Sequence, residues 1–395
     1  MVGGSEIGGA GGVPPPPTPR DRRHEDDEMP RVRLTRRQIT VFAIFMLSAI
    51  GFLYFVLPKL TSAGETVHRI EHGDKWWIAI GIVLEVLSFA GYVVLFRTVF
   101  VKRPHPSSHL ERINWRVTYE ITMAGLAATR LFAAAGAGGI ALTAWALRRS
   151  GMEPRLVACR LVAFNVILYT VYAGSMLIDG LGLGLGLFPG GGSFAITFVP
   201  AIVAAVLFSC AFGIAALPGD MERRIDARAE GGGRLSRFYT RAATVPGLVA
   251  SGVRTAWDVV RAREWGILGA LAWWGFDISV LWAMFHAFGQ PPPFTVIWMA
   301  YFVGTLGNLL PVPGGIGGVE GGMIGAFAAF GVNLELATLA VLSYRAISFW
   351  LPTVPGAIAY FQLRHTVSRW REDDVADMPD ASERRAGSPT TAEAV

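Results

Sequence analysis

The sequence has little charge and almost no cysteine. Asp, Glu, Lys and Arg together make up 16% of its 395 residues, whereas 52% are hydrophobic. Because soluble domains carry about 25% charged residues, this composition argues against an ordinary soluble enzyme. The two cysteines, Cys159 and Cys210, both lie in apolar stretches. This placement indicates small buried residues rather than a disulfide or a metal site.

Catalytic and nucleotide-binding motifs are also missing from the sequence. It contains no G-x-S-x-G, no Walker motif and no H-E-x-x-H. His68 and His72 have helical spacing, but we interpret them as residues of a solvated loop rather than as metal ligands. The glycine run Leu181–Ser193 lacks the lysine and the strand–helix context of a phosphate-binding loop. We therefore expect no cofactor, no metal and no catalytic residue set.

Long apolar stretches are what the sequence has in abundance. Five of them reach the ~20 residues that a helix needs to cross a bilayer. They are Ile39–Leu57, Trp76–Phe96, Leu156–Ile178, Phe194–Leu217 and Trp265–Phe288. A sixth stretch, Leu339–Phe361, is interrupted by Arg345 and two prolines. The pattern predicts an all-α protein, a polytopic helical bundle with about six full spans.

Both ends of the chain differ from this central region. Residues 1–37 are rich in Gly, Pro and charge, and lack the early apolar segment of a secretory signal. Residues 366–395 are polar and show no periodicity. We expect two disordered tails around a transmembrane domain of residues 38–365, with a loop at 219–264 inside it.

The distribution of arginine predicts the orientation of the chain in the membrane. Arginines precede the first span and cluster in residues 97–116, 148–155 and 221–263, which marks these segments as cytoplasmic. We expect a multi-pass protein of a prokaryotic plasma membrane with both termini in the cytoplasm. Since topology accounts for the formal charge of +5, we expect no nucleic-acid partner. Residues 221–263 are also long enough for an amphipathic helix on the membrane surface.

Two segments do not fit this scheme as full spans. Ile113–Leu147 lies between two cytoplasmic segments, and Phe294–Phe330 follows an outward span and precedes an inward one. Each must therefore enter and leave on one face, as a hairpin of two half-helices. Their turns, Ala133–Gly139 and Gly307–Gly322, both run through small residues to Gly-Gly. We expect two opposed re-entrant hairpins in an inverted repeat, an architecture typical of transporters.

The second turn, GNLLPVPGGIGGVEGG, has the composition of a ligand site. Pro311 and Pro313 end one half-helix, because proline lacks the backbone donor. The glycines that follow leave backbone N–H groups unshielded where the next half-helix begins, so an anion such as a lipid phosphate would be stabilised there. These glycines are Gly314, Gly315, Gly317 and Gly318. The spacing of Gly317, Gly321 and Gly325 predicts a face for close helix contact.

Ionisable residues occur in apolar segments, where each costs ~2.5–3.5 kcal/mol on insertion scales. They are Glu85, Glu120, Arg130, Asp277, Glu320 and Arg345. Glu320 lies one turn into the second half-helix, and Arg345 lies well inside the last span, so we expect an ion pair or a shared anionic ligand. Arg130 has the matching place in the first hairpin. The alternative is a set of purely structural pairs that hold helices together.

At Asn308–Gly322 and Tyr344–Tyr360 the chain resembles the membrane domain of lysylphosphatidylglycerol synthases, also called the flippase-like domain family. The resemblance covers roughly Gln38–His365. It rests on Asn308, Pro311, Gly314, Gly315, Gly317, Glu320, Arg345, Trp350, Leu351, Pro352 and Gly356. The first hairpin departs from the family pattern, with Thr129 and Arg130 where relatives often have Asn and Pro-Gly. A short tail after Arg371 stands in place of the aminoacyl-transferase domain, so the resemblance implies the membrane half alone.

The resemblance implies translocation of a phospholipid, or of a lipid-linked glycan phosphate, between leaflets. Its implied partner is that lipid, and a homo-oligomer or envelope-biosynthesis partners are compatible with the sequence. The expected substrate-binding residues are Asn308, Pro311, Gly314, Gly315, Gly317, Glu320, Arg345 and Arg130. Two alternatives stay open. One is a membrane enzyme that modifies a lipid headgroup, with Glu320 as acid or base and Asp277 as its partner. The other is a scaffold that docks envelope proteins on residues 221–263.

Overall fold

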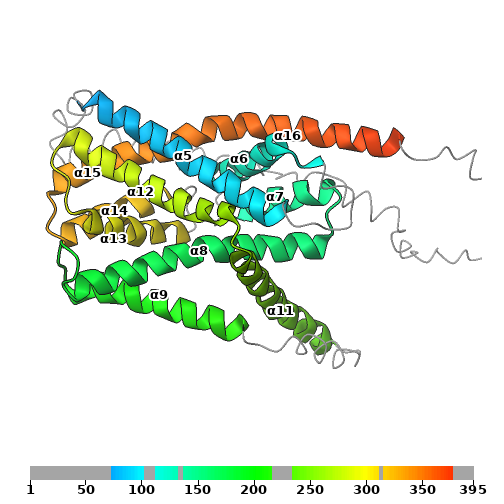
Figure 1. Ribbon diagram of the computed structural model, residues 1–395, viewed down its shortest axis with the longest axis horizontal. Helices are drawn as coiled ribbons and strands as arrows, with labels where there is room; N and C mark the ends of the chain where they lie inside the picture. The colour runs from blue at the N-terminus through cyan, green and yellow to red at the C-terminus, as the bar shows by residue number, and fades with distance from the viewer. Residues whose placement is uncertain (1–72, 102–111, 132–136, 216–233, 311–314, 377–395) are drawn as a thin grey trace, which may run out of the picture.

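The computed structural model describes residues 73–101, 112–131, 137–215, 234–310 and 315–376, and these form helices without any strand (Figure 1). Within these residues, five helices are long and apolar enough to cross a membrane. They are Lys75–Phe100, Pro154–Gly184, Phe194–Ala211, Trp265–Phe288 and Leu334–Asp373. The all-α polytopic prediction is thus confirmed, and five of the six predicted spans are found. The remaining predicted span, Ile39–Leu57, lies outside the described residues.

Both predicted hairpins consist of short helices. The first pairs α6 (Trp115–Leu131) with α7 (Ala137–Arg149), and the second pairs α13 (Phe294–Thr305) with α14 (Gly318–Ala329). Helices α13 and α14 have 12 residues each. At 1.5 Å per residue α14 is ~18 Å long, well short of the ~30 Å of hydrocarbon that a spanning helix crosses. Helix α13 continues through the 3₁₀ turn Leu306–Leu309, which extends this limb to ~26 Å, still less than a full span.

The order of elements repeats with opposite direction. The first unit is α5 (Lys75–Phe100), the α6–α7 hairpin and α8 (Pro154–Gly184). The second is α12 (Leu268–Phe288), the α13–α14 hairpin and α15 (Leu334–Arg345). The two hairpins lie at opposite ends of the bundle, and α5 and α12 run antiparallel side by side (Figure 1). This is the arrangement expected of an inverted repeat.

Small residues let the paired helices approach closely. A Cβ atom added to Gly269 of α12 would lie 2.3 Å from the carbonyl oxygen of Gly91 in α5. In the first hairpin, a Cβ on Gly139 would lie 2.4 Å from the carbonyl oxygen of Gly125. At both places a larger side chain would separate the helices, as is common for membrane helix contacts.

The predicted contact face of the second hairpin is wrong. Among the described residues, a Cβ atom on Gly317, Gly321 or Gly325 would meet nothing within 4 Å. The contact is made one residue further on, where Gly318 faces Gly307 and Gly322 faces Gly304. One residue corresponds to a rotation of ~100° about a helix, so the repeat of four was correct but the helix face was not.

The last span contains an unexpected element. Helix α15 continues through a π-helical turn, Ala346–Trp350, into α16 (Leu351–Ala376). The two prolines of this apolar stretch do not break the helix, because the chain stays helical through Pro352 and Pro355. Helix α16 also runs past His365, the predicted end of the transmembrane domain. Its residues Val367 and Trp370 are buried in the core.

Two further helices of the described residues lie between the two repeats in the sequence. Helix α9 (Phe194–Ala215) packs on α8, and α11 (Arg234–Arg261) lies in the segment predicted to be cytoplasmic. Helix α11 is amphipathic and contacts α8, where a Cβ on Gly252 would lie 2.3 Å from a methyl group of Val162. It leaves the bundle at an angle (Figure 1). Its position relative to the membrane surface stays a prediction.

Candidate functional site

The carboxylate of Glu320 caps the N-terminus of α14. Glu320 is the third residue of this helix, and its Oε2 accepts a hydrogen bond of 2.7 Å from the backbone N–H of Gly317. The N-terminal end of a helix carries partial positive charge, so an anion is stabilised there. The sequence predicts a ligand phosphate at this place. In the structure, the carboxylate of Glu320 occupies this place instead.

The other oxygen of Glu320 pairs with Arg345. Its Oε1 accepts from Nε of Arg345 at 2.7 Å, which confirms the predicted ion pair. The side chains are 16% and 14% exposed, respectively, so water screens the pair weakly. Glu320 comes from the beginning of α14 and Arg345 from the end of α15. The pair therefore joins the tip of the second hairpin to the π-helical turn.

Arg130 reaches the same turn from the first hairpin. It lies in the last turn of α6, and its Nη1 donates to the carbonyl oxygen of Phe349 at 3.1 Å. The guanidinium carbons of Arg130 and Arg345 lie 5.9 and 5.5 Å from the centre of the Phe349 ring. Both distances allow cation–π attraction. Phe349 thus brings the two arginines, and with them the tips of both hairpins, to one place.

Two more carboxyl groups complete this charged cluster, which we define as Glu85, Arg130, Asp277, Glu320 and Arg345. Coulombic interactions link Arg130 with Glu85, Asp277 and Arg345. Glu85 is 2% exposed, and its Oε2 has no hydrogen-bond partner in the described part of the chain. Two cations and three carboxyl groups therefore share one buried region, where rearranging any of them alters the electrostatic energy of the others.

Asp277 is held by two tyrosines rather than by Glu320. Its Oδ2 accepts hydrogen bonds from the hydroxyl groups of Tyr301 and Tyr344, the latter at 3.0 Å. The headgroup-modifying enzyme considered from the sequence pairs Asp277 with Glu320 as acid and base. These hydrogen bonds give Asp277 a different partner set, whereas Glu320 is bound to Gly317 and Arg345.

The turn before α14 depends on two glycines with left-handed backbone. Gly315 has φ = +65° and Gly317 has φ = +83°, values that side chains other than glycine rarely adopt. A Cβ on Gly315 would lie 2.3 Å from Oδ1 of Asn308, so the Asn308 amide lies directly against this turn. Asn308 itself is in the 3₁₀ turn Leu306–Leu309 and is exposed. The predicted site residues Pro311 and Gly314 lie outside the described residues.

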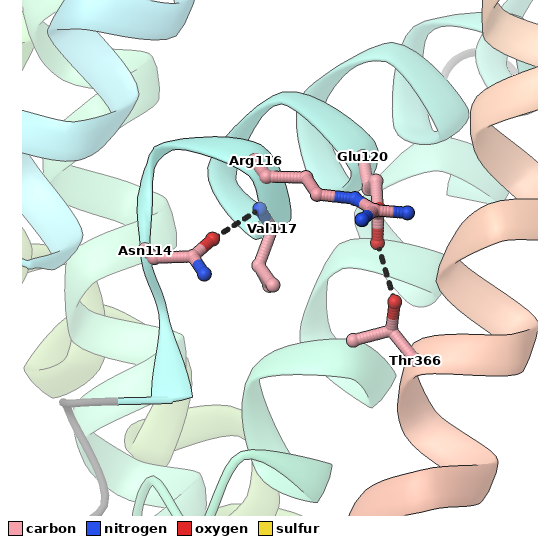
Figure 2. Close-up of polar contacts among 5 residues, drawn as sticks. All are labelled: Asn114, Arg116, Val117, Glu120 and Thr366. Carbon is pink, nitrogen blue, oxygen red and sulfur yellow. Dashed lines mark hydrogen bonds and ion pairs between the residues drawn. The ribbon is translucent and has the colours of Figure 1, made fainter.

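Glu120, another candidate from the sequence, lies apart from the charged cluster in a local network. Its carboxylate is fully buried and accepts from Nε of Arg116 at 2.9 Å and from the hydroxyl group of Thr366 at 2.7 Å (Figure 2). Asn114 caps the same helix by accepting from the N–H of Val117 at 2.9 Å. Since Thr366 belongs to α16, these contacts tie α6 to α16. This geometry supports a structural role for Glu120.

We expect Thr366→Val to lower the free energy of unfolding by about 1 kcal/mol, because one acceptor of the buried Glu120 carboxylate loses its donor. Binding of lipid should not change. Thermal unfolding in detergent, with Ser368→Ala as the control, measures the effect, because the Ser368 hydroxyl group bonds an exposed carbonyl oxygen. A loss of lipid binding in Thr366→Val without loss of stability would contradict the structural role.

Sequence reasoning did not find the π-helical turn or Phe349. A π-helical turn arises from the packing around a helix and has no reliable sequence pattern, although it is frequent at functional sites. One clue was present, because Phe349 follows Arg345 by four residues and so shares its helix face. The tyrosines that hold Asp277 were also missed. They come from α13 and α15, which the sequence alone could not place beside α12.

The architecture and the site define a class: a polytopic helical membrane protein with an inverted repeat, whose charged residues meet where its two hairpins converge. The chain belongs to the lysylphosphatidylglycerol synthase transmembrane-region family, which it matches over residues 37–356. This match includes every predicted substrate-binding residue, from Arg130 to Arg345.

Curated relatives are similar to this chain over shorter stretches. Two UPF0104 membrane proteins of Methanothermobacter thermautotrophicus are 36% identical over 95 residues and 39% identical over 93 residues. These alignments cover 24% and 23% of this chain, and 27% and 28% of the relatives. A UPF0104 membrane protein of Methanocaldococcus jannaschii is 27% identical over 117 residues, which is 29% of this chain and 34% of that protein. The chain thus matches about a third or less of the length of each relative.

Proposed function

We propose that the protein binds the phosphate of a membrane phospholipid, or of a lipid-linked glycan, at the charged cluster and moves it between leaflets. The observation that carries this proposal is the convergence of both hairpin tips on Phe349, through Arg130 and Arg345. In inverted-repeat transporters the site lies between the repeats, and rocking of one repeat against the other exposes it to each side in turn. The cytoplasmic placement of both termini is part of this proposal.

Glu320 acts in this proposal as a resident anion. It occupies both donors that a phosphate would use, Nε of Arg345 and the N–H of Gly317. An arriving phosphate therefore has to displace the carboxylate, and the carboxylate has to return when the phosphate leaves. Because one anion replaces another, Arg345 is not left buried without a counter-charge in either state, which would be costly. Because the phosphate must compete with the Glu320 carboxylate, it binds less tightly and is released more readily.

Arg130 supplies a further, cationic donor for the phosphate, beside Arg345 and the N–H of Gly317. In the structure it donates to the carbonyl oxygen of Phe349, a neutral acceptor. A phosphate oxygen carries negative charge, so it attracts the Arg130 guanidinium more strongly than the neutral carbonyl oxygen does. Exchange of the carbonyl oxygen for a phosphate oxygen is therefore favourable. It would join the first hairpin to a ligand that the second hairpin already holds.

The experiment that tests the proposal is a translocation assay in proteoliposomes. Fluorescent phosphatidylglycerol, lysylphosphatidylglycerol and phosphatidylcholine are placed in one leaflet, and their appearance in the other is followed by quenching. We expect faster movement of the anionic lipid than in protein-free vesicles, with Thr366→Val as an active control. A change in lipid composition without movement would instead indicate an enzyme. If folded protein produced neither change, these phospholipids would be excluded as substrates, and the lipid-linked glycan and the scaffold would be left as the alternatives.

Arg130→Gln should slow this movement by about tenfold or more, because a hydrogen bond to a charged group contributes about 1.5–3 kcal/mol. Glutamine keeps a donor for the carbonyl oxygen of Phe349, so the fold should be retained. The rate in the same vesicle assay measures the effect, and Arg130→Lys should recover part of it. If Arg130→Gln moved lipid at the wild-type rate, Arg130 would not be a ligand residue, and the first hairpin would not contribute to the site.

A further inference from the structure

A groove of about 430 Å³ lies between α5, α6 and α16, beside the charged cluster. Its walls are apolar and include Phe89 and Ala90 of α5, Trp115 of α6 and Pro352 of α16. Its volume is within the usual range of ligand pockets. Trp115 is 57% exposed and Phe89 is 8% exposed, so the groove runs from an open surface to a buried wall.

The groove follows one face of α5. Val86, Phe89, Ala90 and Val93 line it, and their spacing is that of neighbours on one side of a helix. Arg97 continues the same face one turn beyond Val93. At 1.5 Å per residue, the distance from Val86 to Arg97 along the helix is ~16 Å. This length is close to half of the ~30 Å hydrocarbon core, which is the depth of one leaflet.

Two arginines lie against residues that line the groove. The guanidinium carbon of Arg97 lies 4.4 Å from the centre of the exposed Trp115 ring. That of Arg130 lies 5.6 Å from the centre of the buried Phe89 ring. Within the described residues, Arg97 also donates to the carbonyl oxygen of Ile113 at 3.3 Å, and its contacts include no carboxylate. An apolar trough of one leaflet's depth with a cation at its surface end fits an amphiphile with an anionic head.

We propose that this groove binds an anionic phospholipid, with the phosphate at Arg97 and one acyl chain lying along α5 toward Phe89. The charge at Arg97, the length of the groove and its apolar walls all match that ligand. The role of the groove in transport rests on the proposed function: a lipid held there lies next to Arg130, the first member of the charged cluster that it would reach. Binding in the groove does not itself require transport.

Photocrosslinking in vesicles tests the groove without measuring transport. The full chain is reconstituted with phosphatidylglycerol that carries a diazirine at mid-chain, and in parallel with phosphatidylcholine that carries the same chain. Labelled residues are then mapped by mass spectrometry. We expect labels on the groove faces of α5, α6 and α16, with about fivefold more from phosphatidylglycerol, as one arginine at an anionic headgroup predicts. Arg97→Gln should remove this preference.

Ala90→Trp fills the groove, and Val203→Trp is its matched control. Both positions are exposed, and Val203 lies on α9, away from the groove. We expect Ala90→Trp to abolish groove labelling and Val203→Trp to leave it unchanged. Labels spread evenly around the bundle, or equal labelling in the two tryptophan variants, would overturn the proposal. If the groove is labelled but the vesicle assay shows no lipid movement, lipid binding in the groove would be supported and the proposed transport would be contradicted.

Discussion

Replacing Arg345 with Ala is expected to abolish translocation of labelled phosphatidylglycerol and to lower stability as well. The substitution removes the cation that the proposed phosphate contacts, and it leaves the Glu320 carboxylate with Gly317 as its remaining hydrogen-bond donor. Breaking a buried ion pair costs about 3–5 kcal/mol, and we expect the lower end because both side chains keep some exposure. Vesicle transport and thermal unfolding measure the two effects.

The double variant Glu320→Gln/Arg345→Ala separates these two effects. It removes both charges, so the uncompensated carboxylate that destabilises Arg345→Ala is gone, and most of the stability should return. Transport should stay absent, because the phosphate still lacks its cation. If the ion pair only holds α14 against α15, transport would return together with stability. That outcome would refute the assignment of Arg345 as a ligand residue.

Glu320→Gln alone should have a different signature. Without the resident carboxylate, a phosphate meets less competition at Arg345, so binding of phosphatidylglycerol should become tighter. The same loss removes the group that returns to Arg345 when the lipid leaves, so transport should stop. Tighter binding with no movement distinguishes an exchanging anion from a simple structural partner, whose removal would weaken both.

The elements that the sequence predicts well are those set by the membrane itself. Long apolar stretches must be helical in lipid, because no backbone polar group can be left unsatisfied there. The two hairpins follow from the predicted orientation, because a segment that enters and leaves on one face cannot be a single span. The Glu320–Arg345 pair follows from the same reasoning, since a charge in an apolar span needs a partner. These arguments use local composition and cost, so they do not require knowledge of the packing.

What the sequence did not predict depends on packing between distant segments. Glu120 and Glu320 are both carboxylates in apolar segments, yet one meets Thr366 of α16 and the other meets Arg345 of α15. The sequence around each carboxylate does not show which distant residue it meets. The contact face of α14 was misplaced by one residue for a related reason. The helix begins only after Gly317, and that boundary depends on how the turn packs against Asn308.

A comparison of Gly315→Ala with Gly317→Ala tests whether the conformation of this turn fixes the position of Glu320. Both residues have left-handed backbone, so alanine costs about 1–2 kcal/mol at either position. The surroundings differ. A Cβ on Gly315 would lie 2.3 Å from Oδ1 of Asn308 and 2.8 Å from a methyl group of Val319, whereas a Cβ on Gly317 would meet no atom of the described residues within 4 Å.

Gly317→Ala should therefore be destabilised by the backbone cost alone, and should keep transport because its N–H still reaches Glu320. Gly315→Ala should lose about 3 kcal/mol or more, since overpacking adds about 1–3 kcal/mol to the backbone cost. It should also lose transport, because the shifted turn no longer presents the Gly317 N–H to the Glu320 carboxylate. Thermal unfolding and the vesicle assay give both values. Equal effects in the two variants would mean that the turn yields easily at Asn308. In that case the position of Glu320 would be fixed by Arg345 rather than by the glycine-rich turn.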